Sequence, residues 1–484
     1  MSTAAGRRKT MDRNVPEYES RRQSSRVIPG KVGREAVFAS ALSILLACTP
    51  APDGADDDAR SQAAASDAVV DAGAPESPTV RLGVDVLLRD SLALLRGRRV
   101  GLITNHTGLS WTPPAEGRGA PEDGVSTIDR LASHPEIELV ALFSPEHGIR
   151  GRAEAGERVA SERDPATGLP IHSLYGETRR PTPAMLGDVD ALVFDIQDIG
   201  TRYYTYVWTM ALAMEAAGEA GLPFVVLDRP NPIGGRLVQG NVLDPEFATF
   251  VGLYPVPMRH GLTAGELARM LVGEFGIDVD LHVVPMEGWR RDTWYDDTGL
   301  PFIPPSPNMP SLASATHYPG TCLFEGTNLS VGRGTARAFQ QIGAPWLAAD
   351  TVVDRLNALV RTPGAGTGDG PAGLVGVRFE AVEFTPDSPG DGKFGGEPVR
   401  GIRFVATDRQ RYDPTRAAVA ALVEIQRLHA DRLEWRVAHF DRLAGTDALR
   451  RAIVEGVSLR GAVEGWAAQA ARFDTARGPY LLYP

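Results

Sequence analysis

Glu146 has the sequence surroundings of an acid–base catalyst. It lies in FSPEHGIRG (143–151), directly after an apolar run and beside Gly148, which permits a tight turn and close approach of a ligand. A carboxyl group partly buried at such a place has a raised pKa and can act as a general acid near neutral pH. A loop-bracing carboxylate is the alternative. His147 orients this acid, binds substrate or is structural.

The segment DIQDIGTRYY (195–204) brings two further carboxylates close to an arginine and two tyrosines. We expect Asp195 and Asp198 to accept hydrogen bonds from sugar hydroxyls or to hold Arg202, and Tyr203 to form part of a flat wall for a pyranose ring. A fixed ion pair with core aromatics is the alternative. Hard cations need several oxygen ligands from separate elements, and no D-x-D or H-x-H arrangement occurs here, so we expect no metal.

A loop at 318–339, rich in glycine, threonine and arginine, adds Glu325 and Arg333. Such a polar loop is costly to order unless it serves a site. Arg333 would clamp a ligand carboxylate in a bidentate way or form a surface ion pair. The GRG at 332–334 lacks the third glycine and the preceding strand of a dinucleotide fingerprint, so we expect neither NAD nor another cofactor. Cys322 is expected to be buried and inert.

The elements that must position these groups alternate between strand and helix. Apolar runs predict strands at 98–105, 137–144, 189–196 and 223–230, and helical patterns lie at 126–134 and 202–221. This predicts an α/β fold with a Rossmann-like N-terminal domain whose mostly parallel sheet is buried on both faces. In such sheets ligands bind beyond the carboxyl ends of the strands, where the polar clusters should converge on one cleft.

The expected substrate-binding residues are polar side chains of these strand ends and of the later loops: Asn105, His147, Gln197, Asp198, Arg202, Tyr203, Asp228, Asn231, Arg259, His260, Asn308, Asn328 and Arg333. After Gly240 the pattern changes. Helices are expected at 263–275, 414–431, 444–455 and 460–472, strands at 279–285, 374–385 and 400–406, and a surface loop at 366–373. We therefore expect a catalytic domain at 80–240 and a smaller α/β domain at 241–484 that completes the cleft.

The N-terminus has the layout of a secretory leader. The uncharged run AVFASALSILLA (36–47) follows a basic stretch and ends at Cys48 in a sequence that resembles a bacterial lipobox. Twelve residues are too few for a spanning helix, which needs about 20. We expect a signal peptide at 1–48, lipidation of Cys48, and a disordered tether at 49–79 rich in Ala, Asp, Ser and Pro. This places the protein in the cell envelope, anchored to a membrane.

Composition narrows the class further. The 484 residues are 43% hydrophobic and 23% charged, as in a globular protein that folds in water, and the net charge of −11 argues against a nucleic-acid partner. Two cysteines are too few for a disulfide scaffold or a multi-cysteine metal site.

Seven segments in order across residues 80–484 carry a family resemblance: GLITNHTG (101–108), FSPEHGIRG (143–151), DVDALVFDIQDIGTRYYTY (188–206), LDRPNPIGG (227–235), MRHGLTAGELA (258–268), PSPNMPSL (305–312) and FEGTNLSVGRGT (324–335). Together they resemble the NamZ-type exo-β-N-acetylmuramidases, long known as a domain of unknown function. The resemblance implies a glycoside hydrolase that removes N-acetylmuramic acid (MurNAc) from the non-reducing end of peptidoglycan fragments such as MurNAc-GlcNAc, with a cleft between the two domains.

The resemblance implies one site role, and the other roles are our own inference. The catalytic glutamate of the family's S-P-E-H-G motif corresponds to Glu146, which we take as the acid, with Asp195 or Glu325 as the second carboxyl. The 2-acetamido group of the sugar replaces that second group if it attacks its own anomeric carbon. The lactyl carboxylate of MurNAc should meet an arginine, one of Arg202, Arg259 and Arg333. One departure stands out, because Gln239 occupies a place where a glutamate is expected.

Two other functions fit this sequence. One is a non-catalytic lipoprotein that captures muropeptides, which Gln239 and the tether favour. The other is a different hydrolase on the same scaffold, one that cuts the lactyl ether or an amide.

Overall fold

The computed structural model describes residues 80–112, 124–150, 153, 156–158, 160–361 and 373–484. The expected signal peptide, the lipidation site at Cys48, the tether and most of the loop expected at 366–373 lie outside the described residues. Among the helices that are described, none combines the length and apolar character needed to cross a bilayer.

A seven-stranded sheet forms the core of the first lobe. Its strand order is β11 (Leu281–Val284), β8 (Phe224–Leu227), β7 (Ala191–Asp195), β1 (Arg99–Thr104), β4 (Glu138–Ser144), β6 (Pro170–Ser173) and β5 (Glu162–Arg163). All neighbours are parallel except β5 and β6. The four strands expected from the sequence are the four adjacent central ones, β8, β7, β1 and β4. The predicted mixed α/β architecture is confirmed.

Helices cover both faces of this sheet, which explains why its central strands are apolar throughout. One face packs with α1 (Gly83–Asp90) and α2 (Thr127–Ala132), and the other with α4 (Tyr206–Ala220) and α5 (Ala264–Gly273). Alternate residues of β7 enter the two cores, Val193 on one side and Phe194 on the other. A strand that is buried on both sides needs apolar side chains at successive positions.

The second lobe has a three-stranded antiparallel sheet and a helical layer. The sheet order is β12 (Gln341–Ala344), β14 (Val399–Ala406) and β13 (Val377–Phe384). Its helices are α6 (Leu312–Thr321), α7 (Ala349–Arg361), α8 (Pro414–His429), α9 (Val437–Ala444), α10 (Ala448–Val454) and α11 (Leu459–Ala462). The division expected at residue 240 differs from this arrangement, because α5 and β11 follow residue 240 in the chain and yet belong to the first lobe.

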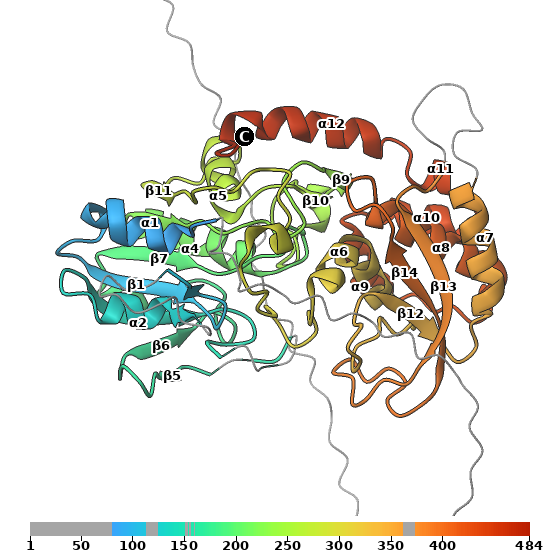
Figure 1. Ribbon diagram of the computed structural model, residues 1–484, viewed down its shortest axis with the longest axis horizontal. Helices are drawn as coiled ribbons and strands as arrows, with labels where there is room; N and C mark the ends of the chain where they lie inside the picture. Colours follow the sequence, from blue (N-terminus) through green and yellow to red (C-terminus); the bar gives the residue numbers. More distant parts are fainter. Residues whose placement is uncertain (1–79, 113–123, 151–152, 154–155, 159, 362–372) are drawn as a thin grey trace, which may run out of the picture. The chain divides into compact units, whose positions relative to one another are not determined.

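The C-terminal segment returns to the first lobe. In Figure 1 the helix α12 (Trp466–Arg477) runs from the second lobe toward α5, beside which the chain ends. The buried side chain of Arg477 donates from Nη1 to the carbonyl oxygens of Gly235, His260 and Gly261, at 3.0, 3.0 and 2.6 Å. One guanidinium therefore ties the last helix to two loops of the first lobe.

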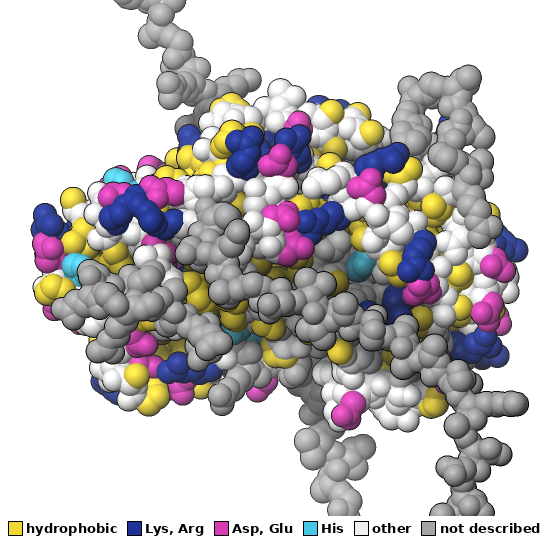
Figure 2. Space-filling view, in the orientation of Figure 1, with side chains coloured by type: hydrophobic (Ala, Val, Ile, Leu, Met, Phe, Trp, Pro, Cys, Tyr) yellow, Lys and Arg dark blue, Asp and Glu magenta, His cyan; other side chains and the backbone are white. Residues whose placement is uncertain are grey.

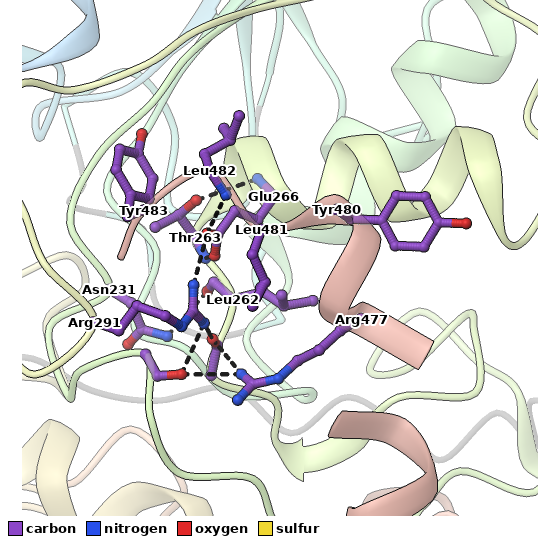
Figure 3. A network of polar contacts seen from close by, with 12 residues as sticks. Asn231, Leu262, Thr263, Glu266, Arg291, Arg477, Tyr480, Leu481, Leu482 and Tyr483 are labelled. Atoms are coloured by element: carbon purple, nitrogen blue, oxygen red, sulfur yellow. Dashed lines mark hydrogen bonds and ion pairs between the residues drawn. The ribbon is translucent and has the colours of Figure 1, made fainter. Parts of the chain in front are cut away.

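The tail beyond α12 is held by buried carboxylates of the first lobe. Figure 3 shows Glu266 between Arg291 and the tail: Arg291 Nη1 donates to Glu266 Oε1 at 2.7 Å, and the backbone amide of Leu482 donates to the same oxygen at 2.9 Å. The hydroxyl of Tyr483 donates to Asp228 Oδ2 at 2.5 Å. Glu266 also caps α5, so the tail and this helix share one anchor.

Arg202 joins the two lobes without the help of a carboxylate. Its side chain is fully buried, and Nη1 donates to the carbonyls of Asn241 (2.8 Å) and Val256 (3.0 Å). Nη2 donates to the carbonyls of Leu443 (3.0 Å) and Ala444 (2.8 Å), the last two residues of α9. The end of a helix offers free carbonyls and partial negative charge, which suit a cation. Burial lowers the pKa of Arg202 to about 10, and it remains protonated at neutral pH.

Replacing Arg202 with methionine should destabilise the protein strongly. The variant keeps the apolar stem but leaves four buried carbonyl oxygens without donors, so we expect the free energy of unfolding to fall by at least about 3 kcal/mol. Urea denaturation followed by circular dichroism measures this. Arg290→Met, at an exposed position, is the control and should change stability by less than about 0.5 kcal/mol. Equal stability of the two variants would contradict the role given to Arg202.

Candidate functional site

Glu146 follows β4 in a turn that requires unusual backbone angles. His147 and Gly148 both have positive φ values, 70° and 73°, and the amide of Gly148 donates to the carbonyl of Pro145 at 3.0 Å. The turn leaves Glu146 8% exposed and directs it to the start of α4, where the Thr205 hydroxyl donates to Oε2 at 2.5 Å. A strained position held in this way is typical of a functional site.

Both oxygens of Glu146 accept hydrogen bonds, since the amide of Gly156 donates to Oε1 at 2.9 Å. Three tyrosines surround it: Tyr175, Tyr204 and Tyr206 each interact with its charge. Burial and then Glu146 raise the pKa of Tyr175 to about 12, so this hydroxyl keeps its proton. Glu146 thus occupies a pocket of hydrogen-bond donors at the end of β4.

Asp198, which follows β7, is a second carboxyl of the same cluster. Its Oδ2 accepts from the amide of Gly200 at 2.6 Å, whereas Oδ1 is buried and has no partner among the described residues. Burial raises the pKa of Asp198 to about 7, against hydrogen bonds from the amides of Gly200 and Ile199 that lower it. The charges of both Asp198 and Glu146 act on the Tyr204 phenol, so the two carboxyls lie at the same edge of the sheet as this ring.

Other predicted residues join this cluster at the ends of β1 and β7. Asn105 accepts from the Thr107 amide and hydroxyl through Oδ1 at 2.9 and 2.6 Å, and Gln197 donates to the carbonyls of Asp198 and Pro230, both at 2.7 Å. Within the described part of the chain, five buried atoms of this cluster have no hydrogen-bond partner: Asn105 Nδ2, Ser144 Oγ, Gln197 Oε1, Asp198 Oδ1 and Tyr204 Oη. Since buried polar atoms are normally paired, these are available to a ligand or to water.

His147 belongs to the same place but is held by the protein. Its Nδ1 lies 2.6 Å from the carbonyl of Ala153, and its ring meets that of Tyr206 edge to face at 6.5 Å. The structure therefore brings together Glu146, His147, Asn105, Gln197 and Asp198 at the carboxyl ends of three adjacent strands, as the sequence predicts.

Asp195 does not present a free carboxylate. It is fully buried, its Oδ1 and Oδ2 accept from Nε and Nη2 of Arg229 at 2.5 and 2.9 Å, and the hydroxyl of Thr127 donates to Oδ2 at 2.5 Å. The expected contact between Asp195 and Arg202 is wrong, because Arg202 binds only backbone carbonyls. Both oxygens of Asp195 are occupied, so a catalytic role for it is not supported by this geometry.

Arg202 and Arg259, both expected to bind the lactyl carboxylate, lie inside the fold. Arg259 is 2% exposed, donates to Gln239 Oε1 at 3.0 Å and to the carbonyl of Ile233, and stacks on Trp294. Burial lowers the pKa of Arg259 to about 10. The sequence-based assignment of either arginine to a ligand carboxylate is corrected on this ground, because both are enclosed and their Nη1 and Nη2 atoms already donate to oxygens of the fold.

Glu325 and Arg333 form a pair in the second lobe. Arg333 Nη2 donates to Glu325 Oε1, and the thiol of Cys322 donates to Oε2 at 3.4 Å. Burial would raise the pKa of Glu325, but the charge and hydrogen bond of Arg333 outweigh it and hold that pKa below its usual value. Burial raises the pKa of Cys322. The alternative to a ligand clamp for Arg333 was a surface ion pair; the structure shows an ion pair with Glu325, but both side chains are largely buried.

The remaining predicted residues form hydrogen bonds within the fold. Asp228 accepts from Thr263 and Tyr483 and caps α5, Asn231 binds the backbone of Leu262 and Ile233, and Asn328 binds that of Arg432 and Glu434. Tyr203 donates to the carbonyl of Pro319. Burial, followed by the charges of three nearby arginines, lowers the pKa of His260 to about 3, so it is neutral.

Asn308 lines a cavity of about 320 Å³ together with residues of the loops at 334–338 and 387–390. Within the described ranges, no three His, Cys, Asp or Glu side chains are grouped as metal ligands would be. On the face drawn in Figure 2, basic and acidic side chains lie next to one another.

Gln239, the departure from the expected glutamate, is engaged within the fold. It stands at the start of β9 (Gln239–Val242), which pairs with β10 (Pro257–Arg259). Its Nε2 donates to the carbonyl of Tyr412 at 3.0 Å, and its Oε1 accepts from Arg259. The amide thus joins the two lobes and has no contact with Glu146 or Asp198.

Sequence reasoning missed Thr205, Tyr175 and Tyr206 as partners of Glu146. Tyr175 follows β6, a four-residue strand too short to stand out as an apolar run, although its polar continuation YGET has the strand-end pattern of the other clusters. Thr205 and Tyr206 lie at the start of α4, within the motif at 188–206. The sequence of this motif does not show which of its side chains turns toward Glu146.

Comparison with known proteins gives a consistent result. Residues 100–313 match the family model described as exo-beta-N-acetylmuramidase NamZ, N-terminal, and residues 316–483 match its C-terminal counterpart. The peptidoglycan beta-N-acetylmuramidase NamZ of Bacillus subtilis is 42% identical over 93% of this chain and 100% of its own. Crystal structures of two DUF1343 family proteins from Bacteroides fragilis each cover 84% of this chain: one is 36% identical, with 100% of its own chain covered and a TM-score of 0.75, and the other is 31% identical, with 99% covered and a TM-score of 0.63.

The raised pKa of Asp198 predicts a stability effect of known sign. The native state holds this proton up to about pH 7 and the unfolded chain only up to about pH 4, so ionising Asp198 costs stability as pH rises between these values. Asp198→Asn removes that cost. We expect the variant to match the wild type near pH 4 and to exceed it at pH 8 by about 2–4 kcal/mol. Denaturant unfolding of both proteins across this range measures the difference, and a constant difference would refute the assignment.

Proposed function

Because the chain belongs to the exo-β-N-acetylmuramidase NamZ family, we propose that it is an exo-acting glycoside hydrolase that releases MurNAc from the non-reducing end of peptidoglycan fragments such as MurNAc-GlcNAc. The observation that carries this proposal is the pair Glu146 and Asp198, two buried carboxyls that follow β4 and β7, the strands on either side of β1, and whose charges both act on Tyr204. Most glycosidases use one protonated carboxyl and one carboxylate at the scissile bond.

Asp198 is the proton donor of this pair. With a pKa of about 7, a large share of the molecules keep this carboxyl protonated at neutral pH, unlike an ordinary aspartate, and the unpartnered Oδ1 is the oxygen that can hold the proton. It protonates the glycosidic oxygen as the bond to the anomeric carbon breaks. Glu146 was expected from the sequence to be the acid, but its two oxygens accept hydrogen bonds, which suits a carboxylate that stabilises the positive charge on the sugar.

The unpartnered atoms around the pair suit a sugar ring. Asn105 Nδ2 is a donor for a carbonyl oxygen, as in a 2-acetamido group, and Gln197 Oε1 is an acceptor for a hydroxyl or an amide N–H. The rings of Tyr204 and Tyr206, which pack edge to face at 5.1 Å, supply aromatic surface beside them. Water that completes hydrolysis adds to the anomeric carbon and returns a proton to the carboxyl pair.

Capture of muropeptides without cleavage is the second candidate, and Gln239 was its support in the sequence. That support weakens because Gln239 is held between Tyr412 and Arg259, away from the two carboxyls. A binding protein also gains nothing from a carboxyl that is kept protonated at a cost in stability.

Glu146→Gln should abolish turnover while leaving the fold intact. Loss of the carboxylate removes the charge that stabilises the transition state, so we expect release of MurNAc from MurNAc-GlcNAc to fall by about 10²–10⁴-fold. Mass spectrometry of the products measures it, with Glu246→Gln, at an exposed position, as the matched control. Release at the wild-type rate by Glu146→Gln, or intact disaccharide with wild-type enzyme, would reject this function.

A substrate with a good leaving group separates the two roles. An aryl MurNAc glycoside whose phenolate leaves without protonation needs no acid, so Asp198→Asn should retain much of its activity on it while losing activity on MurNAc-GlcNAc. Glu146→Gln should lose both. The reverse pattern would return the role of proton donor to Glu146.

Lipid anchoring completes the proposed function. The leader pattern that ends at Cys48 supports acylation of this cysteine and a place in the cell envelope, where peptidoglycan fragments occur. A single folded enzyme tethered at a membrane surface would meet its substrate on the side where the cell wall lies.

Cys48→Ser tests the anchor independently of the chemistry. In a bacterial host, the wild-type protein should incorporate labelled fatty acid and sediment with membranes, and the variant should do neither, because the thiol that accepts the lipid is gone. Cys322→Ser, at a buried position in the second lobe, is the control and should keep the label. Fatty-acid labelling that persists in Cys48→Ser would refute the assignment.

A further inference from the structure

Arg179 is an exposed guanidinium held beside the proposed site by two aromatic rings. It lies in the segment after β6, and its Cζ is 4.6 Å from the centroid of the Tyr175 ring and 4.2 Å from that of Phe250. Stacking of this kind fixes the plane of a guanidinium without neutralising its charge. The cation is therefore positioned in advance, and its N–H donors remain open to an anion.

The charge of Arg179 is not used by a carboxylate among the described residues. No ion pair includes it there, whereas the next residue, Arg180, is paired with Glu219 at 2.5 Å. Tyr175 interacts through its hydroxyl with both Arg179 and Glu146. One buried phenol therefore separates this cation from the carboxylate that we place at the anomeric centre.

We propose that Arg179 binds the lactyl carboxylate of the substrate and thereby selects MurNAc over N-acetylglucosamine. The inference rests on the proposed function. The two sugars differ only in the lactyl group on O3. An enzyme that selects MurNAc through the charge of this group needs a cationic side chain about one sugar ring away from the catalytic carboxyls. Arg179 has the charge, the exposure and the connection to Glu146 that this requires.

The other arginines considered for this role are already engaged. Arg202 and Arg259 are fully enclosed and donate to carbonyl and amide oxygens, and Arg333 is paired with Glu325. Moving any of them to a ligand would leave buried acceptors or a buried carboxylate without a partner, which costs more than the new contact gains. Arg179 can bind a carboxylate without breaking an ion pair of the described residues.

The test compares Arg179→Gln with Arg180→Gln on two substrates. One is MurNAc-GlcNAc, and the other is the same disaccharide with its lactyl carboxylate converted to a neutral amide. We expect Arg179→Gln to raise KM for the first substrate roughly 10- to 100-fold, with little change in kcat, and to leave KM for the second unchanged. Arg180→Gln should behave as wild type on both. Arg179→Lys, which keeps the charge but loses the planar fork, should fall between.

Several outcomes would overturn the proposal. They are an equal rise in KM on both substrates, no rise on either, or the same effect from Arg180→Gln. Binding of free MurNAc and free N-acetylglucosamine to the full chain, measured by calorimetry, separates this proposal from the proposed function. If wild type cleaves nothing but binds MurNAc in a way that Arg179→Gln weakens, the carboxylate site stands and the hydrolase fails. If the wild type cleaves the substrate and Arg179→Gln leaves MurNAc binding unchanged, the hydrolase function stands and the carboxylate site at Arg179 fails.

Discussion

The site depends on five consecutive residues that begin with the buried guanidinium of Arg202. Their contacts are spread over both lobes: Arg202 binds the end of α9, Tyr203 the carbonyl of Pro319, Thr205 the carboxylate of Glu146, and Tyr206 the carbonyl of Pro305 at 2.6 Å. Tyr204 adjoins Ser306. Arg202 has four carbonyl partners from both lobes, and these contacts fix the position of the start of α4. The residues of this segment that lie beside the two carboxyls are fixed with it.

Next to that fixed segment lies a buried carboxyl without an ion pair among the described residues. Some other buried carboxylates are paired, as Asp195 is with Arg229 and Glu266 with Arg291. Asp198 has no cation, keeps one oxygen without a partner and carries a pKa near 7 because of burial. Such an arrangement costs stability and persists where chemistry uses it.

The sequence predicted where the site lies better than what each residue does there. Uniformly apolar strands such as β7 and the clusters after them are visible as patterns, so the convergence of Glu146 and Asp198 follows from topology alone. Burial is not visible in this way. Arginine is usually a surface residue, and the amino-acid sequence does not show that Arg202 is buried among carbonyl groups whereas Arg179 is exposed to solvent. The domain boundary expected at residue 240 was misplaced, because the chain first forms the separate sheet of β9 and β10 and then returns to the seven-stranded sheet as β11.

Chemistry and recognition occupy different dielectric environments in this arrangement. The carboxyl pair is buried, where charges interact strongly and a pKa can be moved, whereas Arg179 is exposed, and an ion pair formed there in water is weak. Binding of the sugar would change that environment, because the sugar ring would exclude water from the space between Arg179 and the tyrosines. The attraction between Arg179 and the lactyl carboxylate would then become stronger as the sugar reaches its bound position. Selection by Arg179 is thus coupled to complete seating of the ring, which is also the position in which the glycosidic oxygen meets Asp198. In a protein of net charge −11, one cation held by aromatic rings rather than by a carboxylate is what keeps this attraction available.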